Sequence, residues 1–458
     1  MNTRFLAGIG FLLLATAAPA QRTRPSLPPR PPFGWPKYCG TTTMSGTPTG
    51  ESPISAQSIS RLSLAWQISL KGPIASEATV LQQTLYVGDW SGTESAINVR
   101  TGAVMAQADL GRTQAPQCTP PTLGITSSAA VVNGRLYVAG GDDAFYALNP
   151  ETLAVMWRHT LGDNSADGGY YGWSSPTIVE GRVLQGVASN CDDPFVRGRL
   201  VALDRFTGEE VASAYFIGEG KVGNGIWTSP AVDSQHRKIF VTTASGLDYA
   251  DGLGYSIVRL DLDSLAIEDS WKVRGGETWD ADWGSSPTLF EDANGNELVG
   301  AGHKDGHYYA FARSNLAAGP LWTAAIAQQG EIPQEGDGTL STAAFDGVRL
   351  YVGGGIPPGS TDPAANGSVV AIDPTSGTIL WRRAFPGPVI APVSTVNGVV
   401  FAAGGNLVEA LDATTGKVLW SHTTAAGIYG GIAIAGDTIF VGDLSGTLYA
   451  FRVGGPAV

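Results

Sequence analysis

The stretch ALDATTGKVLW, residues 410–420, has the pattern of a single β-hairpin. An apolar strand ends in Leu-Asp, a Thr-Thr-Gly turn follows, and a second strand ends at a tryptophan. Alternating apolar residues are typical of strands, and Asp and Gly are typical of the turns between them. Similar stretches occupy residues 371–381, AIDPTSGTILW, and residues 147–157, ALNPETLAVMW. A hairpin that recurs along a chain indicates a repeat architecture.

The recurring hairpin belongs to a longer unit. Each unit opens with a phrase of small residues, continues with a strand ending near a glycine, and then enters the hairpin. Openings of this kind occur at Ser76, Ser127, Ser174, Thr228, Ser285, Ser341, Ala391 and Gly430. A spacing of roughly 35 to 55 residues per unit is typical of the four-stranded blades of a β-propeller.

The two ends of the repeat region complement each other. The last unit stops at LYAFRV, residues 448–453, without its final strand, and LSLAWQISL, residues 62–70, is a tryptophan-containing strand with no unit before it. Pairing these segments closes the ring and removes its free sheet edges. We therefore predict an all-β fold: an eight-bladed β-propeller of four-stranded blades over residues 62–453, closed by an N-terminal strand that pairs with the last blade. Trp157, Trp381 and Trp420 are predicted to pack between neighbouring blades.

The N-terminus has the layout of a secretory signal peptide over residues 1–20. Arg4 precedes an apolar run at residues 5–15, and a small-residue site follows at residues 18–20. We expect a periplasmic or secreted protein, with no membrane span because no stretch reaches the ~20 apolar residues that a bilayer requires. Residues 21–61 are predicted to form a proline-rich N-terminal arm.

Charge and cysteine content exclude some functions and leave one question open. A net charge of −13 argues against nucleic-acid binding, because no basic stripe could offset it. The sequence has no Cys-x-x-Cys-His motif, which argues against covalent c-type haem. Cys39, Cys118 and Cys191 allow at most one internal disulfide, whose pairing stays open. A bond between Cys118 and Cys191 is compatible with their positions, because both are expected in loops on one face.

Departures from the repeat gather in two kinds of loop. Loops that lead into a blade's first strand and loops that join its second and third strands share one face of a propeller. The long ones have residues 189–198, 223–230, 244–254, 275–287 and 355–367. Rigid scaffolds tend to carry their sites on such loops. Their tryptophans and carboxylates suit a planar anionic ligand held by a metal ion.

The repeat phrase Ala-Leu-Asp-x-x-Thr-Gly-x-x-x-Trp resembles the tryptophan-docking repeat of quinoprotein propellers that bind pyrroloquinoline quinone (PQQ). The opening FGWPKYCGTTTMSGTP, residues 33–48, is similar to the polyvinyl-alcohol-dehydrogenase-like branch. The resemblance implies an exported oxidoreductase that oxidises an alcohol, such as a hydroxylated polymer or a secondary alcohol. Hydride would pass to PQQ with the help of Ca²⁺, and electrons to a separate acceptor such as a cytochrome. The same phrase occurs in outer-membrane assembly lipoproteins, so the alternative is a non-enzymatic scaffold for protein interaction or assembly.

The resemblance also implies roles for individual residues. GHKDGHYYAF, residues 302–311, is similar to the segment whose cation touches the quinone oxygens, which matches Lys304. GNGIWTSP matches the segment whose tryptophan forms the floor under the quinone, here Trp227, and Trp173 completes the cofactor-binding set. The segment ETWDADWGSSP resembles the one with the catalytic aspartate, which implies Asp280 and Asp282, with Lys304 as the catalytic cation. An aspartate accepts the alcohol proton and a lysine stabilises negative charge on oxygen.

The implied metal ligands are Asp193, Ser245 and Glu277. Ca²⁺ prefers carboxylate and other hard oxygen ligands. Two of these residues depart from the family pattern: Ser245 stands where an asparagine is usual, and Glu277 aligns with the family's aspartate. The adjacent cysteine pair of many family members is missing, with Cys118 the nearest thiol.

Each of these residues also has a structural interpretation. Trp227 is compatible with a packing ring between blades, Asp193 with a turn residue beside a proline, and Lys304 with an exposed hairpin next to Asp-Gly. His303 and His307 are interpreted as structural or solvated side chains rather than metal ligands.

Overall fold

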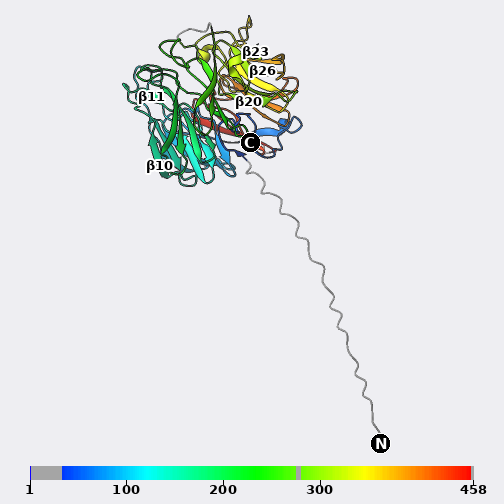
Figure 1. The fold of residues 1–458 in the computed structure, drawn as a ribbon. Helices are drawn as coiled ribbons and strands as arrows, with labels where there is room; N and C mark the ends of the chain where they lie inside the picture. Colours follow the sequence, from blue (N-terminus) through cyan, green and yellow to red (C-terminus); the bar gives the residue numbers. More distant parts are fainter. Residues whose placement is uncertain (2–33, 275–279, 455–458) are drawn as a thin grey trace. The chain divides into compact units, whose positions relative to one another are not determined.

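Apart from Met1, the described residues of the computed structural model are 34–274 and 280–454, and these belong to one compact unit, residues 32–458. Their strands form eight antiparallel sheets, one for each predicted unit. Figure 1 shows the strands of successive sheets following each other in colour from blue to red. The prediction of an eight-bladed propeller is confirmed. The predicted signal peptide lies outside the described residues, except for Met1.

The first four blades have the following strands, from the inner strand outward. Blade 1 has β3 (Thr79–Leu81), β4 (Thr84–Gly88), β5 (Thr93–Asn98) and β6 (Val104–Asp109). Blade 2 has β7 (Ala130–Val132), β8 (Arg135–Ala139), β9 (Ala144–Leu148) and β10 (Val155–Thr160). Blade 3 has β12 (Thr177–Val179), β13 (Arg182–Ser189), β14 (Arg199–Asp204) and β15 (Glu210–Tyr215), and β11 (Tyr170–Tyr171) pairs with the end of β13. Blade 4 has β16 (Ala231–Asp233), β17 (Lys238–Thr242), β18 (Ser256–Asp261) and β19 (Ile267–Lys272).

The other four blades repeat this order. Blade 5 has β20 (Thr288–Glu291), β21 (Glu297–Gly302), β22 (His307–Ala312) and β23 (Trp322–Ala325). Blade 6 has β24 (Ala344–Phe345), β25 (Leu350–Gly354), β26 (Gly367–Ile372) and β27 (Ile379–Phe385), and blade 7 has β28 (Ser394–Val396), β29 (Val399–Gly404), β30 (Leu407–Asp412) and β31 (Val418–Thr423). Blade 8 has β32 (Ala433–Ala435), β33 (Thr438–Gly442), β34 (Thr447–Val453) and β2 (Leu62–Ser69). Short 3₁₀ helices occur at η1 (Ile59–Arg61), η2 (Leu316–Ala318) and η3 (Pro333–Glu335), and none in the described ranges is long and apolar enough to span a membrane.

The ring is closed by the predicted N-terminal strand. β2 pairs antiparallel with β34, in a register that runs from Leu62 opposite Val453 to Ser69 opposite Thr447. The fourth strand of blade 8 therefore comes from the other end of the chain, which leaves β34 without a free edge.

The tryptophans of the outer strands dock on the next blade, as predicted. The Trp157 indole N–H donates to the carbonyl of Arg205 at 3.1 Å, and its ring lies against Gly208 so closely that a Cβ there would be 2.5 Å from it. Trp381 of blade 6 makes the same contact with blade 7, where its ring lies against Gly416, which has a φ of 69°. A glycine is needed at this turn because the positive φ and the facing indole both disfavour a side chain.

Hydroxyl groups join the blades around the inner ring. The small-residue phrase that opens each unit supplies them, and each backbone N–H in the series donates to the hydroxyl of the next blade. The donors and acceptors are Glu77 to Ser128, Ser128 to Ser175, Ser175 to Ser229, Ser229 to Ser286 and Ser286 to Thr342, at 2.8 to 3.1 Å. The repeated serines are therefore inter-blade hydrogen-bonding groups.

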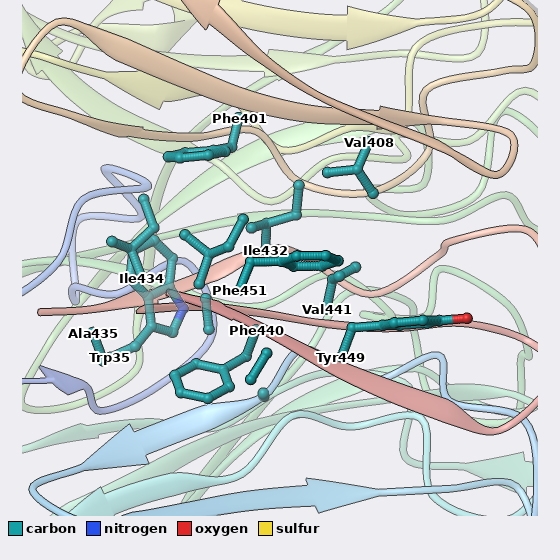
Figure 2. Packing of buried hydrophobic residues seen from close by; sticks show 14 of the residues in the cluster. Trp35, Phe401, Val408, Ile432, Ile434, Ala435, Phe440, Val441, Tyr449 and Phe451 are labelled. Carbon is teal, nitrogen blue, oxygen red and sulfur yellow. The ribbon is translucent and has the colours of Figure 1, made fainter. Parts of the chain in front are cut away.

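Residues 34–49, called the channel segment below, lie inside this ring. β1 (Gly34–Trp35) pairs with β3, and carbonyls farther along accept hydrogen bonds from the inner strands of other blades. The donor N–H groups belong to Val131, Val232, Leu289, Phe345 and Thr395. Figure 2 shows Trp35 packed near Ile434 and Ala435 of blade 8. The described part of the predicted arm thus includes a segment that fills the central channel.

Candidate functional site

The residues of the site come from loops of three neighbouring blades. The predicted ligand Asp193 follows β13, Ser245 follows β17, and Lys304 follows β21. Asp192, beside Asp193, was not among the predicted ligands. Asp282 lies in the segment that leads into β20, and its carbonyl accepts a hydrogen bond from the Lys304 N–H at 3.0 Å. These loops belong to the two kinds that the sequence places on one face of the propeller.

Three carboxylates and a lysine meet there. Asp192, Asp280 and Asp282, called the acidic cluster below, each offer an oxygen within 4.8 Å of the others. The Lys304 Nζ lies 2.6 Å from Asp280 Oδ1 and 3.3 Å from Asp282 Oδ2. The Ser245 N–H donates to Asp282 Oδ1 at 2.5 Å. Asp282 and Lys304 are buried, so this ion pair is screened little by water.

Burial and the charges of neighbouring groups give the carboxylates of the acidic cluster different pKa values. Burial, and then the Asp282 charge, raise the pKa of Asp280 above its usual range and that of Asp192 to about 6. Burial also disfavours ionised Asp282, but Lys304 and hydrogen bonds from its neighbours outweigh it and lower the Asp282 pKa. Burial opposes a charged Lys304 in the same way, and the two carboxylates nevertheless raise its pKa. The cluster therefore holds one ionised carboxylate beside one that binds a proton readily.

The structure distinguishes the adjacent residues Asp192 and Asp193. The Asp192 carboxylate joins the acidic cluster, whereas Asp193 is exposed and its backbone carbonyl accepts a hydrogen bond from the Gln117 amide at 2.7 Å. Asp192 has a φ of 59°, a left-handed conformation that aspartate tolerates better than most residues. The Asp193 carboxylate is not part of the acidic cluster, so metal ligation by Asp193 stays a prediction. The other predicted ligand, Glu277, lies outside the described residues.

The hydroxyl of Ser245 belongs to the same site. Ser245 is 1% exposed, and its side chain contributes a hydrogen bond that helps to lower the pKa of Asp282. The hydroxyl oxygen has a further lone pair that can bind a cation. The three carboxylates and this hydroxyl form an oxygen-only donor set, which fits a hard cation such as Ca²⁺.

The two predicted quinone-binding tryptophans precede the hydroxyl phrases of blades 3 and 4. The Trp173 indole N–H donates to the Ser189 carbonyl at 2.9 Å, next to the loop that carries Asp192. The buried indole nitrogen of Trp227 has no partner among the described residues. Trp227 stands two residues before Ser229, one of the hydroxyl residues that join the blades. The indole of Trp227 therefore lies at the loop end of the channel.

The histidines hold the Lys304 loop, in line with their structural interpretation. The Asp305 N–H donates to His303 Nδ1 at 3.0 Å, and the Asp305 carboxylate lies 3.5 Å from His307 Nδ1. The Tyr309 hydroxyl donates to the other oxygen of Asp305 at 2.5 Å. This network fixes the tight turn on which Lys304 stands.

A small pocket opens beside Lys304. Its lining residues are Ala281, Lys304, Asp305, Gln329, Gly330 and Glu331. Sequence patterns gave no indication of Gln329 and Glu331, because the loop between β23 and β24 carries no repeat. The lining residues include amide and carboxylate side chains, but most of the surface that faces the pocket is apolar.

The cysteines pair across two loops of this face. Cys118 and Cys191 form a disulfide with a Cα–Cα distance of 5.7 Å, and Cys39 is a buried free thiol of the channel segment. The pairing that the sequence left open is therefore the one between the two loops.

Comparison with known proteins agrees with the architecture. A model of the PQQ-type repeat, described as outer membrane protein assembly factor BamB, matches residues 55–315 and 271–455. The chain belongs to the PQQ-type β-propeller family of quinoproteins.

Among its relatives is a polyvinylalcohol dehydrogenase from Sphingopyxis sp. (strain 113P3), 24% identical over 369 residues. The match covers 71% of this chain but 55% of the relative, so the chain spans about half of that protein's length. Quinohemoprotein alcohol dehydrogenase ADHIIG from Pseudomonas putida HK5 superposes with a TM-score of 0.76 at 17% identity, over 93% of this chain and 81% of that one. A europium-containing methanol dehydrogenase has a TM-score of 0.74 at 18% identity, over 92% and 98% of the two chains. At these identities the two structures establish the likeness of the fold.

Proposed function

We propose that this protein is a periplasmic or secreted quinoprotein that oxidises an alcohol, with PQQ as the acceptor and a bound metal ion. The observation that carries the proposal is the acidic cluster with Lys304 between two of its carboxylates. Buried, interacting groups with displaced pKa values are typical of sites that move protons. The dehydrogenases among the relatives support the same function.

The metal ion would be held by the Asp192 and Asp282 carboxylates and by Ser245, which leaves Asp280 able to take up a proton. Carboxylates and a hydroxyl are hard ligands, which favours Ca²⁺ over softer transition metals. Europium, named in one structural relative, is a harder and more highly charged alternative for the same carboxylates. When bound, the quinone supplies the acceptor for hydride, and the metal ion polarises its carbonyl.

The residues of this chain have separate roles in the proposed reaction. Asp280, whose pKa is raised by burial and by Asp282, accepts the hydroxyl proton of the alcohol. Lys304 stays charged and stabilises negative charge on the quinone oxygens as hydride leaves the alcohol. Asp282, held by Lys304 and the Ser245 N–H, stays ionised and keeps the lysine in place. Electrons then pass to a separate acceptor such as a cytochrome.

The substrate that we propose is a hydroxylated polymer or a secondary alcohol. Gln329 and Glu331 line the pocket beside Lys304, and both can hydrogen-bond to hydroxyl groups. The polyvinylalcohol dehydrogenase relative supports this substrate class.

Reconstitution tests the proposed function. The purified protein is mixed with PQQ and either Ca²⁺ or Eu³⁺, and dye reduction is followed with polyvinyl alcohol, a short secondary alcohol and a long alkyl alcohol. Asp192→Asn should weaken metal-dependent quinone binding strongly, whereas Asp193→Asn, one residue away and exposed, should leave it unchanged. Equal losses in the two variants would contradict the assignment of Asp192.

The same experiment tests the alternative of a non-enzymatic scaffold. The family description as an outer-membrane assembly factor favours that alternative. A protein that binds no quinone at about micromolar concentration with either metal, and reduces no dye, would be a scaffold rather than a dehydrogenase.

A further inference from the structure

The loop that carries Asp192 has few attachments at its tip. Before the tip, the Asn190 N–H donates to Gly169, and after it the Val196 N–H donates to the Ser189 hydroxyl. Within the described residues, residues 193 and 194 form a turn, and no main-chain hydrogen bond ties residues 191–195 to another segment. A loop tip without such bonds opens easily, so its position depends on other contacts.

The Asp192 carboxylate accepts a hydrogen bond from the Ser189 side chain of its own loop, and further contacts come from one partner loop. Cys191 forms the disulfide with Cys118, and the neighbouring Gln117 amide donates to the Asp193 carbonyl at 2.7 Å. The Asn190 amide lies 3.4 Å from the Cys118 sulfur. Asp192 therefore stands between two residues that are both tied to the partner loop.

The partner loop is itself well braced. The Thr113 N–H donates to the Leu123 carbonyl at 2.8 Å, and the Ala115 N–H donates to the Pro121 carbonyl at 2.9 Å. The Cys118 N–H donates back to Ala115 at 2.9 Å, which places the cysteine at the tip of a small hairpin. The disulfide thus joins a loop tip with several internal hydrogen bonds to one that has few.

We infer that the Cys118–Cys191 disulfide is a positioning element of the metal site: it holds the Asp192 carboxylate within reach of Asp280 and Asp282. This inference rests on the proposed metal site. Removing a group that orients a metal ligand typically lowers the metal affinity roughly 10- to 100-fold. The metal affinity of this protein therefore depends on whether the disulfide is oxidised or reduced, although neither cysteine is a metal ligand.

Reduction of the folded protein follows from thiol–disulfide exchange. Dithiothreitol is oxidised to its cyclic disulfide, and two electrons and two protons convert the bond to the Cys118 and Cys191 thiols. Removal of the reductant and reoxidation restores the bond, which makes each sample its own control.

Calcium titration by calorimetry on the apoprotein tests the inference without any enzymatic assay. The double variant Cys118→Ser/Cys191→Ser and the reduced parent should both bind Ca²⁺ with a Kd roughly 10- to 100-fold higher than the oxidised parent. The reoxidised parent should recover its affinity. Amide hydrogen exchange in residues 190–196 should be faster in both reduced forms. If the double variant fails to fold, the reduced parent gives the answer.

A merely structural disulfide would lower the melting temperature of the apoprotein and leave the Kd for Ca²⁺ unchanged. That result, with a parent that binds Ca²⁺, would overturn this inference and leave the proposed function standing. A parent that binds no Ca²⁺ would overturn the metal site and this inference together.

Discussion

Glu77 is a buried carboxylate against the channel segment, and its titration should govern how stability depends on pH. Its Oε2 accepts the Cys39 N–H at 2.6 Å. Burial raises the pKa of Glu77 to about 7, although hydrogen bonds from Trp35 and Cys39 and the charge of Lys37 favour its ionised form. Burial likewise lowers the pKa of Lys37 to about 8, so at neutral pH the lysine is mostly charged.

The sign of the effect follows from the two states of the chain. In the unfolded chain Glu77 titrates near 4.5, and in the folded protein near 7. Between these values the folded protein keeps a proton that the unfolded chain has lost, so the free energy of unfolding falls as pH rises. The difference between these two pKa values, at ~1.36 kcal/mol per pH unit, corresponds to ~3 kcal/mol, most of it between about pH 5 and about pH 8. Well above the pKa that Glu77 has in the folded protein, this contribution to the free energy of unfolding is lost completely.

Glu77→Gln replaces the titrating group with a neutral one of the same shape. Urea unfolding is measured at about pH 5 and about pH 8 for the parent, for this variant, and for Glu209→Gln, which is exposed. Other groups titrate in this range as well, so the relevant quantity is the difference between parent and variant. The parent should lose ~2.5 kcal/mol more than Glu77→Gln over this range, and Glu209→Gln should follow the parent. An equal loss in the parent and Glu77→Gln would refute the assigned burial cost.

Three further predictions concern the ring and the site. Deleting β2 should lower the melting temperature and cause self-association through the exposed edge of β34, as seen by calorimetry and light scattering; a monomer of unchanged stability would contradict the closure. Gly416→Ala should lower the free energy of unfolding by more than Gly398→Ala, by roughly 1 kcal/mol or more, because both have positive φ but only Gly416 faces an indole, that of Trp381. Lys304→Ala should depress turnover in dye reduction roughly a hundredfold while changing quinone affinity less, and a loss confined to affinity would count against charge stabilisation.

Local patterns were enough to predict the blades. Each strand shows an alternation of apolar residues in the sequence. The turn at Gly416 has a positive φ, and the glycine itself indicates that conformation. The channel segment could not be predicted in the same way. Its partners are backbone N–H groups of several blades, such as Val131 and Thr395, and a backbone group has no signature in the sequence.

The site was accessible to sequence reasoning only in part. Lys304 lies in a short, constrained turn after β21, so its position follows from the repeat, whereas Asp282 lies in the long loop that leads into β20. Asp192 and Asp193 differ in the structure because of a left-handed backbone at Asp192, which the residue types leave undetermined. Glu331 lines the pocket from a loop without repeat character, where no periodicity limits the chain.

Blade 5 explains why the acidic cluster lies at the loop end of a closed channel. Along its leading segment, Asp282 belongs to the cluster, and Ser286 follows in the hydroxyl ring. Leu289 comes next, and its N–H donates to the Thr43 carbonyl of the channel segment at 2.9 Å. Three layers therefore succeed one another within a few residues: charged side chains, inter-blade hydroxyls and the segment that fills the channel. With the channel filled beneath the hydroxyl ring, a ligand reaches the cluster from the loop face, and the loops tied by the disulfide flank its path.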